Sequence, residues 1–385
     1  MQNDGGVEAL PGQPVVSVVI PTLDAGQGLA GLLEAVHAQQ VPGGVELVVI
    51  DSGSRDGTPE RARGAGARVL SIPRRHFDHG RARNQAIAAS SGEFVALTVQ
   101  DAMPADVGWL GRLLAPLLGP TEVAGSYGLQ VAPPSAGLLE RTRSSLWCEA
   151  HGEPRLQSLS DPEALAALEP EERLEQIRFD NVTSCIRRKV WEAIPFPEGN
   201  FGEDMGWARA VLLAGHKLAC VPSARVWHSH ERGWFYELRR SYVDGRNRVR
   251  LVDWPPAGLD PGEGLAVLRR LAFFVRTRRF DRVSDVLAGR RFLREELRRY
   301  ETLDPVRPTQ VYLEALGFGM ALTERAARLR ADGQFREGEW IRLFRFALAV
   351  STGRALGTSA AARKGASPGV TAFWGGLDQL LGRTV

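Results

Sequence analysis

Cysteine is scarce in this chain of 385 residues, which contains only Cys148, Cys185 and Cys220. The number is odd, and no pair has the CxxC spacing, so the pattern argues against both a disulfide framework and a structural zinc site. We therefore expect the protein to work in a reducing compartment, the cytoplasm.

Long hydrophobic runs are also missing. No stretch of about 18 uncharged apolar residues occurs, and the opening MQNDGGVEALPGQP lacks the basic segment and apolar run of a signal peptide. The sequence predicts neither standard secretion nor a transmembrane helix. Hydrophobic residues at 44% and charged residues at 24% lie near globular averages, which excludes a disordered or fibrous chain and indicates one large domain with an appendage.

A strong excess of either charge is absent overall, since the net charge is +3, but the charges are unevenly distributed. Residues 251–385 hold 22 Lys and Arg against 15 Asp and Glu, and the residues before them hold 26 against 30. A basic tail suits nucleic acid, an anionic lipid surface or simply a solvated helical surface. Because no nucleic-acid-binding motif accompanies it, we do not expect a nucleic-acid partner.

Strand and helix patterns alternate over the first hundred residues. Continuous apolar runs rich in β-branched residues at 15–20, 45–50, 68–72 and 93–99 predict buried strands, and the segments between them have helical spacing. This order predicts an α/β fold with a mainly parallel, Rossmann-like sheet and helices on both faces. After a polar, acidic stretch the strand and helix signals return, and the chain then becomes helical to its end.

Four polar loops follow the four predicted strands, at residues 21–24, 51–54, 74–84 and 100–101. Any one of them has a structural interpretation as a turn with a helix N-cap. In a parallel sheet, however, ligands bind outside the carboxyl ends of the strands, so the four loops together predict one ligand site.

Several motifs, taken in order, resemble the family 2 glycosyltransferases with the GT-A fold. They are VSVVIPTLDAG, VVIDSGSRDGT, a strand ending in an aspartate, and GNFGEDMGWARAVLLAGHKL, between about Val15 and Arg250. HFDHGRARNQA, ALTVQDAMP, RFDNVTSCIRRKVWEAIPFPE and VWHSHERG are similar to bacterial rhamnosyltransferase-type members that build surface polysaccharides. The resemblance implies inverting transfer of a sugar, with rhamnose suggested, from a nucleotide-diphosphate donor to a saccharide or lipid-linked acceptor.

The resemblance also implies roles for the loop residues. Asp51 would accept a hydrogen bond from the nucleotide base, although the structural alternative is an Asx turn that caps the next helix. Arg83 would belong to the donor pocket, where its guanidinium offers forked donors to phosphate or sugar oxygens. The implied nucleotide-sugar-binding residues are Pro21, Thr22, Asp24, Asp51, Ser52, His79, Gly80, Arg83, Asn84, Gln100 and Asp101.

The metal motif departs from the DxD pattern common in the family. Val99, Gln100 and Asp101 occupy its positions, so one carboxylate is missing and Asp101 alone would face a cation. Rhamnosyltransferase-type relatives often show such a QD pair. Oxygen ligands suit Mg²⁺ or Mn²⁺. His228 and His230, two residues apart at a strand end, lie on one side of the strand, and either imidazole as a further ligand would favour Mn²⁺.

Glu203 and Asp204 open a predicted helix, whose N-terminus stabilises carboxylates whatever their role. The resemblance implies that Asp204 is the general base for the acceptor hydroxyl and that Glu203 binds or orients the acceptor. Because one metal aspartate is missing, a catalytically inactive nucleotide-sugar-binding or scaffold protein of the same fold remains the alternative. A nucleotidyltransferase is disfavoured, because PTLDAGQG after the first strand contains no lysine.

We therefore expect a GT-A catalytic domain in residues 1–254, with an acceptor-side insertion at 131–180, and a basic helical region in residues 255–385. Between residues 262 and 300, arginines alternate with Leu, Phe and Val at amphipathic spacing. These helices either pack on the catalytic domain or bind an anionic surface at the inner face of the cell membrane, where a lipid-linked acceptor resides.

Overall fold

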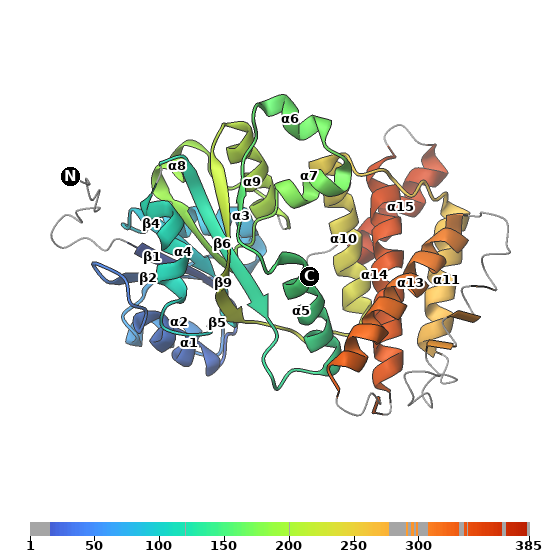
Figure 1. Ribbon diagram of the computed structural model, residues 1–385, viewed down its shortest axis with the longest axis horizontal. Helices are drawn as coiled ribbons and strands as arrows, with labels where there is room; N and C mark the ends of the chain where they lie inside the picture. The colour runs from blue at the N-terminus through green and yellow to red at the C-terminus, as the bar shows by residue number, and fades with distance from the viewer. Residues whose placement is uncertain are drawn as a thin grey trace. The chain divides into compact units, whose positions relative to one another are not determined.

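A computed structural model of the chain divides into two compact units (Figure 1). The α/β unit comprises Met1–Pro133 and Trp147–Ser229, and the helical unit comprises Pro134–Leu146 and His230–Val385. The structure describes residues 16–119, 121–199, 201–276, 290–291, 294–295, 298, 307–330, 335–336, 338–363 and 367–382.

One sheet organises the α/β unit, with the strand order β3-β2-β1-β4-β8-β6-β9-β5 and β7 paired to β9. The strands are β1 (Val16–Thr22), β2 (Val45–Asp51), β3 (Arg68–Ser71), β4 (Phe94–Thr98), β5 (Met103–Pro104), β6 (Val123–Val131), β7 (Arg155–Gln157), β8 (Thr183–Arg187) and β9 (Lys217–Trp227). The helical segments that precede β9 in the chain are α1 (Gly28–His37), α2 (Thr58–Gly64), η1 (Arg74–His76), α3 (His79–Ala88), α4 (Trp109–Leu118), α5 (Leu138–His151), α6 (Pro162–Ala167), α7 (Pro170–Gln176), α8 (Arg188–Ala193) and α9 (Glu203–Leu213). Residues of α5 up to Leu146 belong to the helical unit.

The first four strands form the parallel part of the sheet. β1 pairs in parallel with β2 and β4, and β2 pairs in parallel with β3, so the predicted βαβ order is confirmed. The register sets Thr22 beside Asp51 at the carboxyl ends of β1 and β2. Beyond β4 the orientation is mixed, because β8 runs antiparallel to both β4 and β6 while β6 and β9 are parallel.

Helices cover both faces of the sheet, as the alternation of buried residues requires. Val18 and Ile20 of β1 share one core cluster with Leu32 of α1 and Leu113 of α4. The α3 helix packs against β1 and β2 and also contacts α9, and its buried Ala86 lies outside that cluster. The central strands β1 and β4 are therefore buried on both sides, and polar loops follow their carboxyl ends.

The helical unit consists largely of long helices with its own apolar core around Tyr242, Tyr312 and Trp340. It includes α10, because α10 packs along α14. Whether residues 1–254 act as the catalytic domain stays a prediction. The helices are α10 (Trp234–Val252), α11 (Pro261–Arg276), α13 (Arg307–Arg328), α14 (Glu339–Ala361) and α15 (Pro368–Leu381).

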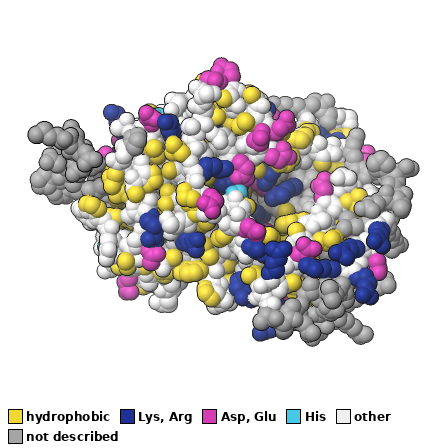
Figure 2. Space-filling view, viewed as in Figure 1, with side chains coloured by type: hydrophobic (Ala, Val, Ile, Leu, Met, Phe, Trp, Pro, Cys, Tyr) yellow, Lys and Arg dark blue, Asp and Glu magenta, His cyan; other side chains and the backbone are white. Residues whose placement is uncertain are grey.

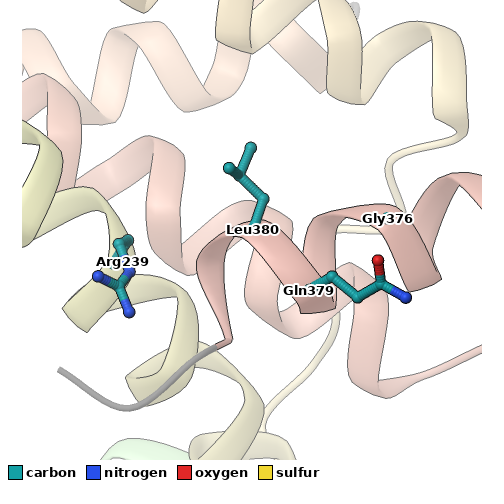
Figure 3. Close-up of a pocket in the computed structure, with 4 residues that line it drawn as sticks. All are labelled: Arg239, Gly376, Gln379 and Leu380. Carbon is teal, nitrogen blue, oxygen red and sulfur yellow. The ribbon is translucent and has the colours of Figure 1, made fainter.

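The surface of the helical unit shows two features. Basic side chains gather over part of its visible face in Figure 2, in keeping with the basic tail of the sequence. An open pocket between α10 and α15 is lined by Arg239, Gly376, Gln379 and Leu380 and contains none of the predicted site residues (Figure 3). Among the residues that the structure describes, we find no helix with the length and apolar character needed to cross a bilayer. Much of the predicted amphipathic segment 262–300 lies outside the described residues.

Close packing of α10 on α14 depends on glycine. A Cβ atom at Gly357 would lie 2.0 Å from the carbonyl oxygen of Tyr242, and one at Gly353 would lie 2.4 Å from that of Leu238. Real Cβ atoms do not approach backbone this closely, so the helices would have to separate. In contrast, a Cβ atom at the exposed Gly317 in α13 would meet nothing within 4 Å.

We predict that Gly357→Ala destabilises the protein by about 1–3 kcal/mol, the usual cost of forcing extra atoms into a packed core. Gly317→Ala is the matched control and should be neutral or stabilising by about 0.5–1 kcal/mol, because alanine favours a helix over glycine. Urea unfolding of both variants measures the difference. Equal stability of the two variants would show that the α10–α14 contact is looser than the structure has it.

Candidate active site

Asp51 ends β2 with its carboxylate 2% exposed and fully engaged by its own chain. One oxygen accepts hydrogen bonds from the hydroxyls of Thr22, at 3.1 Å, and Ser54, at 2.5 Å. The other accepts from the backbone N–H groups of Gly53, at 3.0 Å, and Ser54, at 2.9 Å. A carboxylate has about four acceptor positions. Asp51 thus adopts the Asx-turn arrangement, and a nucleotide base would have to replace one of these partners.

The loops after β1 and β2 are joined to each other by side chains. The carboxylate of Asp24 accepts from the backbone N–H of Arg55 at 2.8 Å, and the hydroxyl of Ser54 accepts from the backbone N–H of Asp24 at 2.8 Å. Asp24 is exposed and has a φ of 46°, a left-handed conformation that aspartate tolerates better than most residues. Ser52 is buried, with its hydroxyl donating to the carbonyl of Thr22.

Gln100 clamps the first loop from the other side. Its side-chain oxygen accepts from the backbone N–H of Leu23 at 2.7 Å, and its amide nitrogen donates to the carbonyl of Leu23 at 3.1 Å. The amide group therefore imitates a strand pairing just past the end of β1. The adjoining Asp101, by contrast, is exposed at this rim.

A buried ion pair connects α3 to α9. The guanidinium of Arg83, 4% exposed, donates to the carboxylate of Glu203, 7% exposed, at 2.6 Å. Asn181 also faces this carboxylate, at 3.3 Å from its amide nitrogen. Glu203 is thus directed into the protein toward Arg83, where it holds two helices together. From the sequence, Glu203 was assigned to the acceptor and Arg83 to the donor pocket, and no contact between these two residues was predicted.

The other predicted residues of α3 face neighbouring backbone. Asn84 donates to the carbonyl of Phe196 at 2.8 Å and accepts from the indole of Trp191 at 2.8 Å. Gly80 lies so close to Pro197 that a Cβ atom would be 2.0 Å from its carbonyl oxygen. His79 is half-buried at the start of the helix. These residues hold the segment that leads into α9.

Asp204 lies next to Glu203 in the first turn of α9 and is half-buried. Desolvation by the surrounding protein, with the nearby carboxylates of Glu203 and Asp180, raises the pKa of Asp204 to about 7. The backbone N–H of Met205 and the charge of Arg83 oppose this shift without cancelling it. A carboxylate with a pKa near neutrality is suited to accept a proton from a substrate at physiological pH.

Three potential metal ligands meet at the other end of the site. Asp101, His228 and His230 offer ligand atoms that all lie within 4.8 Å of one another. Within the α/β unit, Nε2 of His228 lies 3.3 Å from Oδ1 of Asp101. The structure therefore brings together Asp101, predicted as a metal ligand, and the two histidines predicted as candidates for a further ligand.

The sequence-based set omitted two residues that the structure connects to this site. Gln130, near the end of β6, contacts His228, and Asp180, just before β8, contacts Gln130. Asp180 belongs to the RFDNV segment that was noticed only for its resemblance. The signal in the sequence that could have identified Asp180 is its position a few residues before β8, which begins at Thr183.

Known proteins similar to this chain decide its family. The glycosyl transferase family 2 model matches residues 17–143. The O-antigen chain rhamnosyltransferase WbaN of Salmonella anatum is 30% identical over 237 residues, which cover 60% of this chain and 71% of that protein. The chain belongs to glycosyl transferase family 2. It is accordingly an enzyme of nucleotide-sugar transfer, and the α/β GT-A fold that the resemblance implied is confirmed.

Further members of the family are similar to this chain. The O-antigen chain rhamnosyltransferase RfbN of Salmonella typhimurium is 28% identical over 234 residues, covering 60% of this chain and 71% of that protein. Among solved structures, glucosyl-3-phosphoglycerate synthase from Mycobacterium tuberculosis in complex with Mn²⁺, UDP-glucose and phosphoglyceric acid covers 64% of this chain and 82% of its own, with 23% identity and a TM-score of 0.46.

We predict that Glu203→Gln chiefly lowers stability, because it leaves the buried charge of Arg83 without its counter-charge. Breaking a buried ion pair on one side costs about 3–5 kcal/mol, whereas replacing both partners costs much less. The double variant Arg83→Met with Glu203→Gln should therefore recover most of the loss in thermal unfolding temperature. If Glu203→Gln instead kept the wild-type unfolding temperature and lost acceptor affinity, the acceptor-binding role predicted from the sequence would hold.

Proposed function

We propose that the protein is an inverting glycosyltransferase that moves a sugar, suggested to be rhamnose, from a nucleotide-diphosphate donor to a saccharide or lipid-linked acceptor. The observation that supports this most is Asp204, a carboxylate in the first turn of α9 whose pKa is raised to about 7 by burial and neighbouring carboxylates. A protein that only bound nucleotide sugars would have no need of such a base. Similarity to two O-antigen chain rhamnosyltransferases supports rhamnose as the sugar.

In the proposed reaction, Asp204 takes the proton of the acceptor hydroxyl. The acceptor oxygen then forms a bond to the anomeric carbon from one side while the bond to the donor phosphate oxygen breaks on the other. The nucleoside diphosphate leaves with the bonding electron pair. A single displacement of this kind inverts the anomeric configuration. The Arg83–Glu203 ion pair would keep the first turn of α9, and so Asp204, in place.

The residues at the rim fit a divalent cation. One carboxylate and two imidazoles with ligand atoms within 4.8 Å of one another are a donor set of the kind that binds Mn²⁺ more readily than Mg²⁺. Asp101, His228 and His230 would hold the ion. When bound, such a cation supplies charge neutralisation for the diphosphate leaving group. The single aspartate in the QD pair is thereby compensated by imidazole.

A membrane-associated acceptor would suit the exposed side of α11. Leu265, Arg269 and Phe273 follow one another at four-residue spacing, and Leu265 and Phe273 are 40% and 64% exposed. An apolar stripe with a basic residue is the composition of a helix that rests on anionic lipid. We propose that the enzyme acts on a lipid-linked acceptor at the inner membrane surface.

We predict that dTDP stabilises the protein against heat more than UDP or GDP, and that the shift requires Mn²⁺. Ligand stabilisation grows with affinity, so a thermal-shift screen ranks the nucleotides directly. Asp101→Asn should remove the Mn²⁺-dependent part of the shift. The neighbouring surface variant Asp106→Asn, whose carboxylate pairs with Arg112 at 2.6 Å, serves as the control. A nucleotide shift that survives EDTA in the wild-type protein would rule out the proposed role of the cation.

We predict that Asp204→Asn lowers transfer on the order of a hundred- to ten-thousand-fold while nucleotide affinity stays near wild type. The base must be ionised to accept a proton. With its pKa raised to about 7, wild-type kcat/KM should rise about tenfold per pH unit below that value and level off above it.

Glu60→Gln is the matched control, because Glu60 is also an acid in the first turn of a helix, α2, but is exposed and pairs with Arg63 at 3.5 Å. It should keep both activity and the pH profile. Substantial transfer by Asp204→Asn with an unchanged acidic limb would place the base elsewhere.

A further inference from the structure

Gln130 joins two ends of the site that the sequence left unconnected. Its side-chain oxygen lies 2.7 Å from Nδ1 of His228, and its amide nitrogen donates to Oδ2 of Asp180 at 2.5 Å. The strand order explains this reach, because β6 lies between β8 and β9. Gln130 is near the end of β6, His228 follows β9, and Asp180 precedes β8. One side chain therefore spans the ends of three adjacent strands.

The chemistry of the partners determines which way the amide group points. An ionised carboxylate only accepts hydrogen bonds, so the atom of Gln130 that faces Asp180 must be the NH₂ group. The carbonyl oxygen of the amide then faces His228. Because that oxygen only accepts, Nδ1 of His228 must carry a proton.

This proton determines what His228 presents on its other side. In a neutral imidazole one nitrogen donates and the other accepts, so Nε2 is the accepting nitrogen of His228. Nε2 points toward Oδ1 of Asp101, 3.3 Å away. In this tautomer Nε2 and Oδ1 both offer electron pairs, as the ligands of a cation must. The backbone supports the same placement, since the N–H of His228 donates to the carbonyl of Val131, next to Gln130.

We propose that Gln130 is a positioning residue: it holds His228 in the tautomer with the proton on Nδ1, so that Nε2 and Asp101 together face the cation, and it ties this end of the site to Asp180. The proposal rests on the proposed function, because it takes Asp101 and His228 as cation ligands. Asp180 in turn acts electrostatically on Asp204. Gln130 thus links the residues that would hold the leaving group with those around the base.

The first experiment compares Gln130→Leu with the wild-type protein in the absence of sugar donor. Loss of a partner that orients a metal-ligating histidine typically weakens metal binding by about 10–100-fold. We expect that loss in a Mn²⁺ titration followed by electron paramagnetic resonance. The control is Gln176→Leu, since Gln176 is also half-buried and its amide donates to a carbonyl, that of Ser158 at 2.7 Å, away from the histidines. It should bind Mn²⁺ as the wild type does.

A second readout does not depend on metal or activity. In metal-free protein labelled with ¹⁵N-histidine, NMR at about two pH units above the ordinary histidine pKa of about 6.5 reports which ring nitrogen carries the proton. His228 should be protonated on Nδ1 in the wild-type protein and should show mixed tautomers in Gln130→Leu. The double variant Gln130→Glu with Asp180→Asn keeps an acceptor for Nδ1 and gives the new carboxylate an amide donor at position 180, so it should restore the tautomer and most of the Mn²⁺ affinity.

Two results would overturn the proposal: a wild-type His228 protonated on Nε2, or equal Mn²⁺ affinity in Gln130→Leu and wild type. Failure of the Gln130→Glu, Asp180→Asn double variant to restore the tautomer would also contradict it, because the acceptor atom would then not be what matters. Failure of the proposed function looks different. A wild-type protein that transfers no sugar, yet shows the Nδ1 tautomer and the Gln130-dependent Mn²⁺ affinity, would refute the reaction and leave the role of Gln130 intact.

Discussion

The ion pair between Arg83 and Glu203 is the contact on which the geometry of the site depends most. It connects α3 and α9, whose paired residues are 120 positions apart, at 2.6 Å and out of reach of solvent. Two charges removed from water are tolerated only when they meet each other closely, so the pair fixes the distance between the helices. Asp204 follows Glu203 in the first turn of α9, so the ion pair also fixes the position of Asp204.

Many of the polar residues at the strand ends form hydrogen bonds with one another or with the neighbouring backbone. Asp51 gathers Thr22 and Ser54, and Gln100 pairs with the backbone of Leu23. Buried polar groups need such partners, because an unpaired one is costly. The loops are therefore held in shape in advance, which spares a nucleotide the cost of ordering them. Asp101 and Asp204 are the carboxylates that we propose for cation binding and proton transfer.

The sequence was sufficient to predict the sheet where its strands are continuously apolar. β1, β2 and β4 read directly from their Val, Ile and Leu content, and the meeting of loops at their carboxyl ends follows from the parallel order. β6 could not be read in this way, because Gly125 and Gly128 interrupt it. A Cβ atom at Gly128 would lie 1.8 Å from the carbonyl of Ala224, so glycine is there for close approach to β9. Because β6 was not predicted, the position of Gln130 near its end and the hydrogen bond from Gln130 to Asp180 were not predicted either.

The roles of individual site residues were harder to predict than their location. A single sequence lists Arg83 and Glu203 without showing that they face each other, since pairing across 120 residues depends on the folded path of the chain. Asp101, His228 and His230 were easier, because strand ends limit where such side chains can go. The packing of α10 on α14 could not be predicted either, since a proline-rich segment near residue 254 says nothing of which helices α10 contacts.

The saturated carboxylate of Asp51 has a consequence for how donor preference changes over evolution. The four acceptor positions of Asp51 are occupied by Thr22 at the end of β1 and by Gly53 and Ser54 after β2. A substitution of Asp51 would loosen both of these segments at once, so this position cannot be adjusted gradually to a different nucleotide base. An exposed neighbour such as Arg55, which contributes its backbone N–H and not its side chain to the link with Asp24, can vary without that cost. We therefore expect substitutions that change nucleotide preference to fall on exposed side chains around the two loops, and substitutions of Asp51 to disturb the loops themselves.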